Sequence, residues 1–392
     1  MQRIAIVIII SFLNYLTLDA QLLKIGLFNE LNTKAIVFSV VNGSYLISGD
    51  GRAIESIKQR QNLYIALEGD SLRCIGIQIN YGLFKDLHFN SMVDSGIFSL
   101  RPVDPQENIR FYDDNLELCK RLGKLQTINH VDIDKYISGV VEAEGGYKAA
   151  PEYYKSQALL CRTYALSHLD RHTEEYFNLC DGTHCQAYNG RNTGGTAILK
   201  ASFDTRGLVV LDTDTTFITA AFHSNCGGET ENSSNVWLIN KPYLKSVQDP
   251  YCQNQKCFRW ERKLTLEQWK QYLLKNDFHL KSSMPISFFN YTQYCRRQYY
   301  RLGKDSLTFR RIRNDFNFRS AFFSLEVKGD SIQIHGRGYG HGVGLCQEGA
   351  MQMAKLGYNF REIIQFYYQG VNIAEFSNVP VNKNPTLKLL GK

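Results

Sequence analysis

Four short segments of this sequence combine residues that can bind a ligand or move a proton, and the first contains Glu144. Its carboxyl group stands beside Gly145 and Gly146, on a connection that precedes an expected helix beginning at Pro151. A carboxyl group among apolar neighbours keeps its proton near neutral pH and can donate it to a leaving oxygen. Glu142 competes for this role, and a solvated loop glutamate is the simplest interpretation, so local chemistry alone does not choose.

The second segment brings two thiols and an imidazole close together in sequence. Cys180, His184 and Cys185 lie within six residues, and such a set can surround tetrahedral Zn²⁺ while leaving one position for a distant residue or water. A small Cys180–Cys185 disulfide loop or two free thiols would explain the same cysteines. Because a histidine stands between them, we expect a structural Zn²⁺ site, with the disulfide as its alternative.

The third segment, residues 222–231, follows an apolar stretch and is polar. Its two adjacent glycines would let backbone N–H groups approach a ligand, and His223 or Cys226 could supply the missing metal ligand. Ser224 is not a hydrolase nucleophile, since the Gly-x-Ser-x-Gly pattern is absent. A tight turn with incidental polar groups is the simpler alternative.

The fourth segment, residues 336–344, is rich in glycine and surrounds His341. It lacks the Gly-Lys-Ser/Thr ending of a phosphate loop, and its spacing does not fit a dinucleotide fingerprint. A glycine-rich wall around a histidine fits a sugar-binding or catalytic cleft better. A packed turn before a helix would explain the glycines but not the histidine.

These segments require a framework of strands and helices to bring them together. Strands and helices do not alternate regularly enough for a doubly wound sheet, so we expect an α+β fold, mainly of antiparallel sheets with several helices and long cleft-forming loops. The expected strands lie at residues 23–29, 35–41, 63–68, 71–79, 122–132, 208–211 paired with 217–222, and 322–327 paired with 331–335; the expected helices lie at 133–137, 151–170, 193–200, 264–275, 345–355 and 360–369.

The composition is typical of a globular protein with a large core. Of 392 residues, 44% are hydrophobic and 12% are aromatic, which is enough for two or three domains or one elaborated domain. The net charge of +7 suits an acidic polymer such as a cell-wall glycan. Since the basic residues form no long run, we do not expect nucleic-acid binding.

The N-terminus has the pattern of a secretory signal peptide over residues 1–20. Arg3 precedes an apolar run, and the segment ends on the small residue Ala20. No second run of spanning length follows, so we expect an exported protein of the periplasm or cell envelope without a transmembrane segment; an uncleaved anchor is the alternative. In an oxidising compartment cysteines tend to pair, and the spacing predicts a Cys252–Cys257 disulfide.

Taken together and in this order, the four segments resemble the stage II sporulation protein D family of peptidoglycan lytic transglycosylases, which are related to amidase-enhancer proteins. The resemblance implies a β-rich region at 21–120, a catalytic domain at 121–375 with an insertion around 250–315, and a tail at 376–392. Two departures stand out, since Gly145-Gly146 replaces Met-Pro and Cys226 replaces a common serine. The matching segments are Tyr136 to Gly146, Gln157 to Ala165, Leu179 to Tyr188, Phe222 to Glu231, Val236-Trp237, Pro242 to Asp249 and Gly336 to Ala350.

The resemblance also implies roles for particular residues. Glu144, rather than Glu142, occupies the family's catalytic position, and it would act as both acid and base in cleaving the bond between N-acetylmuramic acid and N-acetylglucosamine, with 1,6-anhydro ring formation. The Gly145-Gly146 departure could loosen this residue. The residues expected to line the same cleft and bind the glycan are Arg162, His184, Gln186, His223, Ser224 and His341.

Two other functions are compatible with the sequence. A non-catalytic wall-binding protein that activates a cell-wall amidase is the first, and the glycines beside Glu144 favour it. A zinc-dependent amidase that uses the Cys180–Cys185 cluster is the second. Catalytic zinc sites usually rely on histidine and carboxylate ligands without a thiolate pair, which argues against it.

Overall fold

The computed structural model describes residues 22–146, 148–237 and 239–391. The expected signal peptide, residues 1–20, lies outside the described residues. The described chain has the predicted α+β fold, and its strands pair antiparallel except for β1 with β13 and β15 with β21. No described helix is long and apolar enough to cross a membrane.

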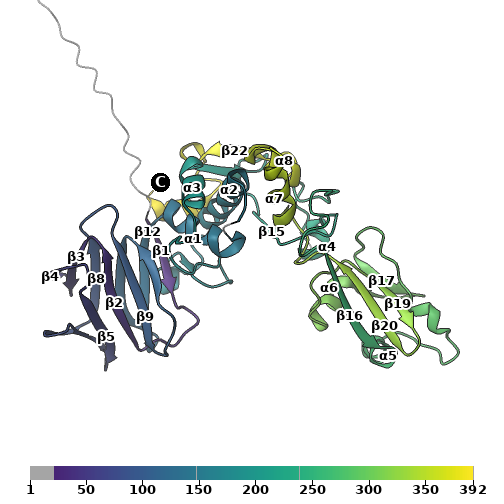
Figure 1. Ribbon diagram of the computed structural model, residues 1–392, viewed down its shortest axis with the longest axis horizontal. Helices are drawn as coiled ribbons and strands as arrows, with labels where there is room; N and C mark the ends of the chain where they lie inside the picture. The colour runs from purple at the N-terminus through teal and green to yellow at the C-terminus, as the bar shows by residue number, and fades with distance from the viewer. Residues whose placement is uncertain (1–21, 147, 238, 392) are drawn as a thin grey trace, which may run out of the picture.

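Two sheets pack face to face in the N-terminal part of the chain (Figure 1). One has the order β13-β1-β12-β11-β8-β3-β4 and the other β10-β9-β2-β5-β6-β7. Buried and less buried positions alternate along β3 and β11, so each sheet turns one apolar face inward. Between them, Phe38 stacks on Phe89 and Phe98, with ring centroids 4.4 and 5.4 Å apart. The strands are β1 (Leu22–Leu27), β2 (Ala35–Asn42), β3 (Ser44–Gly49), β4 (Arg52–Lys58), β5 (Asn62–Glu68), β6 (Ser71–Ile75), β7 (Asn80–Phe84), β8 (Asp86–Ser91), β9 (Ile97–Asp104), β10 (Arg110–Asp113), β11 (Asn115–Arg121), β12 (Lys124–Asp132) and β13 (Leu179–Cys180).

A group of helices covers one end of these sheets and continues their core (Figure 1). α2 contacts α1 and α3 on one side and α7 and α8 on the other. The capping box of Asn359 and Glu362, expected from the sequence, is present at the start of α8. The helices of this group are α1 (Ile133–Gly145), α2 (Pro151–Ser167), α3 (Thr196–Asp204), α7 (Gln347–Lys355) and α8 (Phe360–Tyr367), with short 3₁₀ turns at Thr173–Glu175, Phe376–Asn378 and Pro385–Leu390. The short helix α4 (Ser233–Trp237) lies apart from α1, α2 and α3 (Figure 1).

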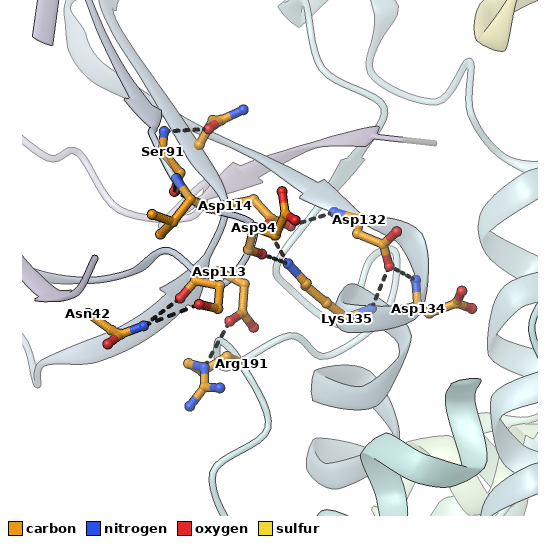
Figure 2. Close-up of polar contacts among 12 residues, drawn as sticks. Asn42, Ser91, Asp94, Asp113, Asp114, Asp132, Asp134, Lys135 and Arg191 are labelled. Carbon is orange, nitrogen blue, oxygen red and sulfur yellow. Dashed lines mark hydrogen bonds and ion pairs between the residues drawn. The ribbon is translucent and has the colours of Figure 1, made fainter. Parts of the chain in front are cut away.

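Polar contacts fix the start of α1 against the sheets (Figure 2). Asp132 caps the helix, since its side chain accepts hydrogen bonds from the backbone N–H groups of Asp134 and Lys135. Its own N–H donates to Asp114 (2.9 Å), and the Lys135 ammonium lies 2.5 Å from the same carboxylate. The sheets therefore hold the first turn of the helix whose last turn carries Glu144.

The helix α1 is longer than the sequence predicted. We expected a helical segment of five residues and placed Glu144 on a loop, but α1 continues to Gly145. The glycine inside the helix, Gly139, weakened the helical pattern. It is needed there because a Cβ atom would lie 2.2 Å from the carbonyl oxygen of Gly190. The loop that carries the second segment could not otherwise approach the helix.

The strands at 208–211 and 217–222 do not form the expected hairpin. β14 (Leu208–Leu211) pairs instead with β22 (Asn372–Glu375), and β15 (Phe222–His223) pairs with β21 (Leu345–Cys346). Between the two segments the described chain keeps an isolated bridge of Leu211 with Phe217 and two backbone hydrogen bonds, from Asp212 to Thr216 and from Ile218 to Val210. Chain segments more than 100 residues away supply the true partners, so local turn signals could not predict them.

A second hydrophobic core lies at the other end of the molecule (Figure 1). It is centred on the fully buried Trp269 and packed between a three-stranded sheet, β16-β20-β19, and two helices. The hairpin predicted around Lys328 is present in it as β19 and β20. Its elements are β16 (Arg259–Thr265), α5 (Leu266–Lys275), a 3₁₀ turn (Ile286–Phe289), β17 (Tyr299–Leu302), β18 (Asp305–Thr308), α6 (Phe309–Asp315), β19 (Phe323–Lys328) and β20 (Ser331–Arg337).

Candidate active site

A cavity of about 670 Å³ lies where α1 meets parts of the other three sequence segments. Glu144, His184, Gln186 and His341, all predicted for the cleft, line it. Its remaining wall is largely apolar, which suits the ring faces of a sugar as well as the protonated form of a carboxyl group. The other lining residues are Tyr164, Ser167, His168, Thr183, Cys185, Phe217, Ile218, Thr219, Ala220, Ala221, Phe222 and Trp237.

Glu144 lies in the last turn of α1 with its side chain half-buried at this cavity. One carboxylate oxygen accepts a hydrogen bond from the backbone N–H of Ala187, at 3.3 Å. Burial raises the pKa of Glu144, and the Ala187 N–H opposes this shift only in part. A carboxyl group with a raised pKa is suited to donate a proton near neutral pH.

Glu142 is held in a different place, which separates the two competing carboxylates. Residues two apart on a helix are rotated by about 200° around its axis, so their side chains point to nearly opposite sides. The Glu142 oxygens accept hydrogen bonds from the backbone N–H groups of Gly194 (2.6 Å) and Thr193 (3.1 Å). Glu142 is absent from the lining of the Glu144 cavity and fastens the loop before α3. The geometry thus favours Glu144 as the residue that meets a ligand.

The glycines after Glu144 end α1 tightly rather than loosely. Gly146 has φ +65°, in the left-handed region that favours glycine, and its N–H donates to the Glu142 carbonyl (3.0 Å). A Cβ atom on Gly145 would lie 2.6 Å from the Tyr153 hydroxyl oxygen. The side-chain amide of Gln347 also donates to the Glu144 carbonyl, at 3.3 Å. Gly145 and Gly146, which replace the family's Met-Pro, are therefore held by close packing against Tyr153 and by the turn that ends α1.

His172 joins Cys180, His184 and Cys185 to form a four-residue cluster. The four potential ligand atoms all lie within 4.8 Å of one another. Cys185 Sγ lies 3.4 Å from His172 Nε2 and 3.7 Å from His184 Nδ1, and both thiols are free in the structure. The other ring nitrogen of His172 is hydrogen-bonded to the Glu175 carboxylate, an arrangement common for histidines that bind a metal. Two thiols and two imidazoles fit the tetrahedral coordination of Zn²⁺.

Electrostatics within the cluster favour a thiolate ligand. Hydrogen bonding from Cys185 lowers the pKa of Cys180 to about 4, while the proton shared between them raises the pKa of Cys185. The fourth ligand was missed because we sought it at His223 or Cys226, which belong to other clusters. His172 stands in no recognised motif, and only its position eight residues before Cys180 could have suggested it.

The histidines of the third and fourth segments lie together beside the cavity. The His341 ring contacts His223 and Trp237, with ring centroids 5.5 and 5.4 Å away. His341 Nδ1 accepts a hydrogen bond from the Val343 N–H (3.0 Å). Burial, reinforced by the positive charge of Arg313, lowers the pKa of His341 to about 4, so its ring is neutral at neutral pH. His223 is buried and its pKa is lowered as well, mainly by burial.

Glycines permit this close approach of the fourth segment to β15. Gly340 and Gly344 have φ values of +112° and +71°. A Cβ atom on Gly340 would lie 2.8 Å from the Cβ of His223, and one on Gly344 would lie 2.2 Å from the Ala221 carbonyl oxygen. The glycine-rich pattern is thus a packing requirement of the cavity wall.

Three of the predicted glycan-binding residues, Arg162, His223 and Ser224, do not line the cavity. Arg162 is 1% exposed, pairs with Asp134 at 2.7 Å and donates to the carbonyl of Ser202, so it stabilises the helix group and cannot reach a ligand. Ser224 is absent from the cavity lining, and its carbonyl accepts the N–H of Glu348 (3.0 Å). By contrast Gln186 lines the cavity, and its buried Nε2 has no hydrogen-bond partner among the described residues.

Comparison with known proteins identifies relatives of this chain. The stage II sporulation protein family model matches residues 121–211, which include Glu144 and the His172 cluster. Stage II sporulation protein D of Bacillus subtilis is 30% identical over 266 residues, or 64% of this chain and 76% of that protein. An uncharacterized protein of Brachyspira hyodysenteriae is 29% identical over 312 residues, covering 78% of this chain and 81% of its own. The amidase enhancer of Bacillus subtilis is 26% identical over 298 residues, which cover 61% of this chain and 40% of that protein.

Proposed function

Because this chain belongs to the stage II sporulation protein D family, we propose that it is a lytic transglycosylase that cleaves peptidoglycan glycan strands, with Glu144 as its acid and base. Family membership supports a cell-wall-related role. The observation that carries the enzymatic assignment is the single carboxyl group of Glu144, half-buried at a largely apolar cavity with its pKa raised by burial. The substrate is the bond from N-acetylmuramic acid to N-acetylglucosamine.

The proposed reaction needs one carboxyl group. Protonated Glu144 donates its proton to the glycosidic oxygen, and the bond from that oxygen to the muramyl C1 breaks. The resulting carboxylate takes the proton of the muramyl C6 hydroxyl, whose oxygen bonds to C1 and closes the 1,6-anhydro ring. Glu144 ends protonated, as it began, and no water is consumed. The second carboxylate of ordinary glycosidases is therefore not required.

The remaining cavity residues would bind and orient the sugar. Gln186 lines the cavity, and a small rotation of its side chain would let Nε2, which has no hydrogen-bond partner among the described residues, donate to a carbonyl or hydroxyl oxygen of the sugar. The neutral ring of His341, with its low pKa, adds no charge that would hold Glu144 ionised. Trp237 offers an aromatic face to a sugar ring at the same cavity.

A Zn²⁺ ion would suit the His172 cluster in a structural role. His172, Cys180, His184 and Cys185 would fill all four tetrahedral positions, which leaves none open for a catalytic water. This argues against a zinc-dependent amidase. The ion would stiffen the loop that presents Gln186 and the Ala187 N–H to the cavity.

Activation of a cell-wall amidase is the second candidate, favoured by the similarity to a protein named amidase enhancer. Digestion of glycan strands stripped of stem peptides tests the transglycosylase, and digestion of intact peptidoglycan by an added amidase, with and without this chain, tests the activator; mass spectrometry identifies the products of both. Anhydro-muramyl ends made by the purified chain alone support the transglycosylase. If no such ends appear and stem-peptide release by an added amidase increases, the chain is an activator and the first proposal fails.

We further propose that the chain works outside the cytoplasm, where its substrate lies. The signal-peptide pattern at residues 1–20 supports export. Cell fractionation, with and without residues 1–20, tests this. Recovery of both forms in the cytoplasm would contradict it.

A further inference from the structure

A second group of potential metal ligands lies outside the cavity. It consists of Cys226, Asp249, Cys252 and Cys346, whose exposures are 0%, 1%, 0% and 0%. One ligand atom of each lies within 4.8 Å of the others. Three thiols and a carboxylate at one buried point are an unusual set for a core, because burying a carboxylate costs free energy even where it is hydrogen-bonded.

The distances within this group lie a few tenths of an ångström below those between ligands of one tetrahedral ion, so small side-chain shifts would admit the ion. Cys226 Sγ lies 3.4 Å from Cys252 Sγ and 3.2 Å from Asp249 Oδ2. Ligands of tetrahedral Zn²⁺, at about 2.3 Å for sulfur and 2.0–2.2 Å for oxygen, are separated by roughly 3.5–3.8 Å. A disulfide would require the sulfurs to approach to about 2.05 Å and would leave Cys346 and Asp249 without a role.

Backbone donors surround the sulfurs as they would surround thiolates. The N–H of Gly228 donates to Cys252 Sγ, and the N–H of Cys226 donates to Cys346 Sγ, both at 3.2 Å. Gly228 has φ +98°, a left-handed conformation that lets the backbone turn toward the sulfur. The Arg296 guanidinium donates to the Cys226 carbonyl (2.6 Å), which brings a positive charge to this negatively charged group.

The carboxylate is also held in place by neighbours that are not acids. Asp249 Oδ2 accepts a hydrogen bond from the Tyr367 hydroxyl (3.0 Å), and Oδ1 accepts one from the Tyr251 N–H (2.9 Å). Such outer contacts orient ligands at metal sites. A bound cation would offset the cost of burying this carboxylate, which is 1% exposed.

We propose that Cys226, Asp249, Cys252 and Cys346 bind a second Zn²⁺ ion. Cys226 follows β15 and Cys346 ends β21, so the ion fastens these two paired strands to each other. β15 carries His223, and β21 is followed directly by Gln347, which donates a hydrogen bond to the Glu144 carbonyl. The site also joins the loop at Asp249 and Cys252, just before the chain enters the second core. The site is separate from the His172 cluster and its existence does not depend on glycan cleavage.

This proposal corrects the expected Cys252–Cys257 disulfide. Both thiols are free, and Cys252 faces Cys226 and Asp249. The Cys257 N–H instead donates to the Glu348 carboxylate at 3.1 Å. The cysteine that replaces the common serine of the family, Cys226, thus stands at the centre of the new site.

Zinc analysis of the full chain without its signal peptide tests the proposal. The protein is loaded with Zn²⁺ under reducing conditions, dialysed, and its zinc measured by mass spectrometry. A C180A/C185A background removes the first cluster, and we expect it to retain one zinc per chain. Adding C226A and C252A should remove that zinc, whereas the matched control C74A, at a buried thiol of the N-terminal sheets, should not. A folded C180A/C185A chain without zinc overturns the proposal.

A second measurement covers the case in which these variants do not fold. Co²⁺ replaces Zn²⁺ in the chain with all its cysteines, and D249N is compared with it. The chain with all its cysteines should show stronger sulfur-to-cobalt absorption than C226S, because C226S lacks one thiolate ligand. D249N should show a changed cobalt d–d spectrum. Both results together support a site of three thiolates and one carboxylate. Identical spectra for all three proteins, or a Cys226–Cys252 disulfide in the unreduced chain by peptide mapping, contradict it.

Discussion

The backbone N–H of Ala187 donates a hydrogen bond to the carboxylate of Glu144 at 3.3 Å, two residues after Cys185 in the His172 cluster. The loop that gathers the cluster is therefore the same loop that contacts the acid. Gly139 makes this arrangement possible, because it lets the continuation of the loop at Gly190 approach α1. Any change that loosens the cluster should also alter Glu144, and the first predictions concern this residue.

We expect Glu144→Gln to lower the rate of cleavage of peptide-free glycan strands about 10²–10⁴-fold, because general acid–base catalysis contributes a rate enhancement of that size. Glycan binding should persist, since the amide keeps the shape of the carboxyl group. Glu142→Gln is the matched control, two residues away. It should keep cleavage and lose about 1–3 kcal/mol of stability, because its charged hydrogen bonds to Thr193 and Gly194 are weakened. Anhydro products from Glu144→Gln at the wild-type rate would exclude it as the acid.

Stability should depend on pH through Glu144 in a defined direction. Burial raises its pKa in the folded state, so the folded chain binds the proton more tightly than the unfolded chain. The folded state therefore loses stability as the pH rises from the unfolded pKa through the raised folded pKa. Glu144→Gln removes this loss, and its melting temperature should exceed that of the wild type at neutral pH. The difference should vanish below the ordinary glutamate pKa; a constant difference from pH 3 to pH 8 would contradict the raised pKa.

Sequence patterns predicted the framework of this protein better than its long-range pairings. Alternating burial is local, so strands such as β3 and β11 and the β19–β20 hairpin could be anticipated. The partner of β15 lies more than 100 residues away at β21, and no local signal could reveal it. Gly139 concealed most of α1, because its reason for being there is a contact with Gly190 in another segment.

The same distinction applies to the candidate site. Ordered segments identified Glu144, Gln186 and His341 as cavity residues. Arg162 was assigned to the cleft because it belongs to a matching segment, but its buried partner Asp134 lies 28 residues away and draws it into the core. His172 was missed for the opposite reason, since it becomes a neighbour of Cys185 only after the chain turns at the end of α2.

The hydrogen bond between His172 and Glu175 gives a prediction about metal binding. Glu175→Gln should weaken zinc binding at this cluster about 10–100-fold, because the carboxylate orients the imidazole and raises its basicity. Glu174→Gln changes an exposed neighbour and is the matched control. Competition with a chromogenic chelator measures the affinity, in a C226A/C252A background that removes the other thiol cluster. Equal affinities for the two glutamine variants would remove Glu175 from the site.

The packing beneath the acid can be tested with a double-mutant cycle. Gly145→Ala places a Cβ atom 2.6 Å from the Tyr153 hydroxyl oxygen, and such overpacking costs about 1–3 kcal/mol. Tyr153→Phe removes that oxygen, so the double variant should recover much of the lost stability and, with it, the position of Glu144. Urea unfolding gives the four free energies, and glycan cleavage by the same proteins reports the acid. Additive losses without recovery would mean that Gly145 is not required by its contact with Tyr153, and that another constraint ends α1 beside the catalytic carboxyl group.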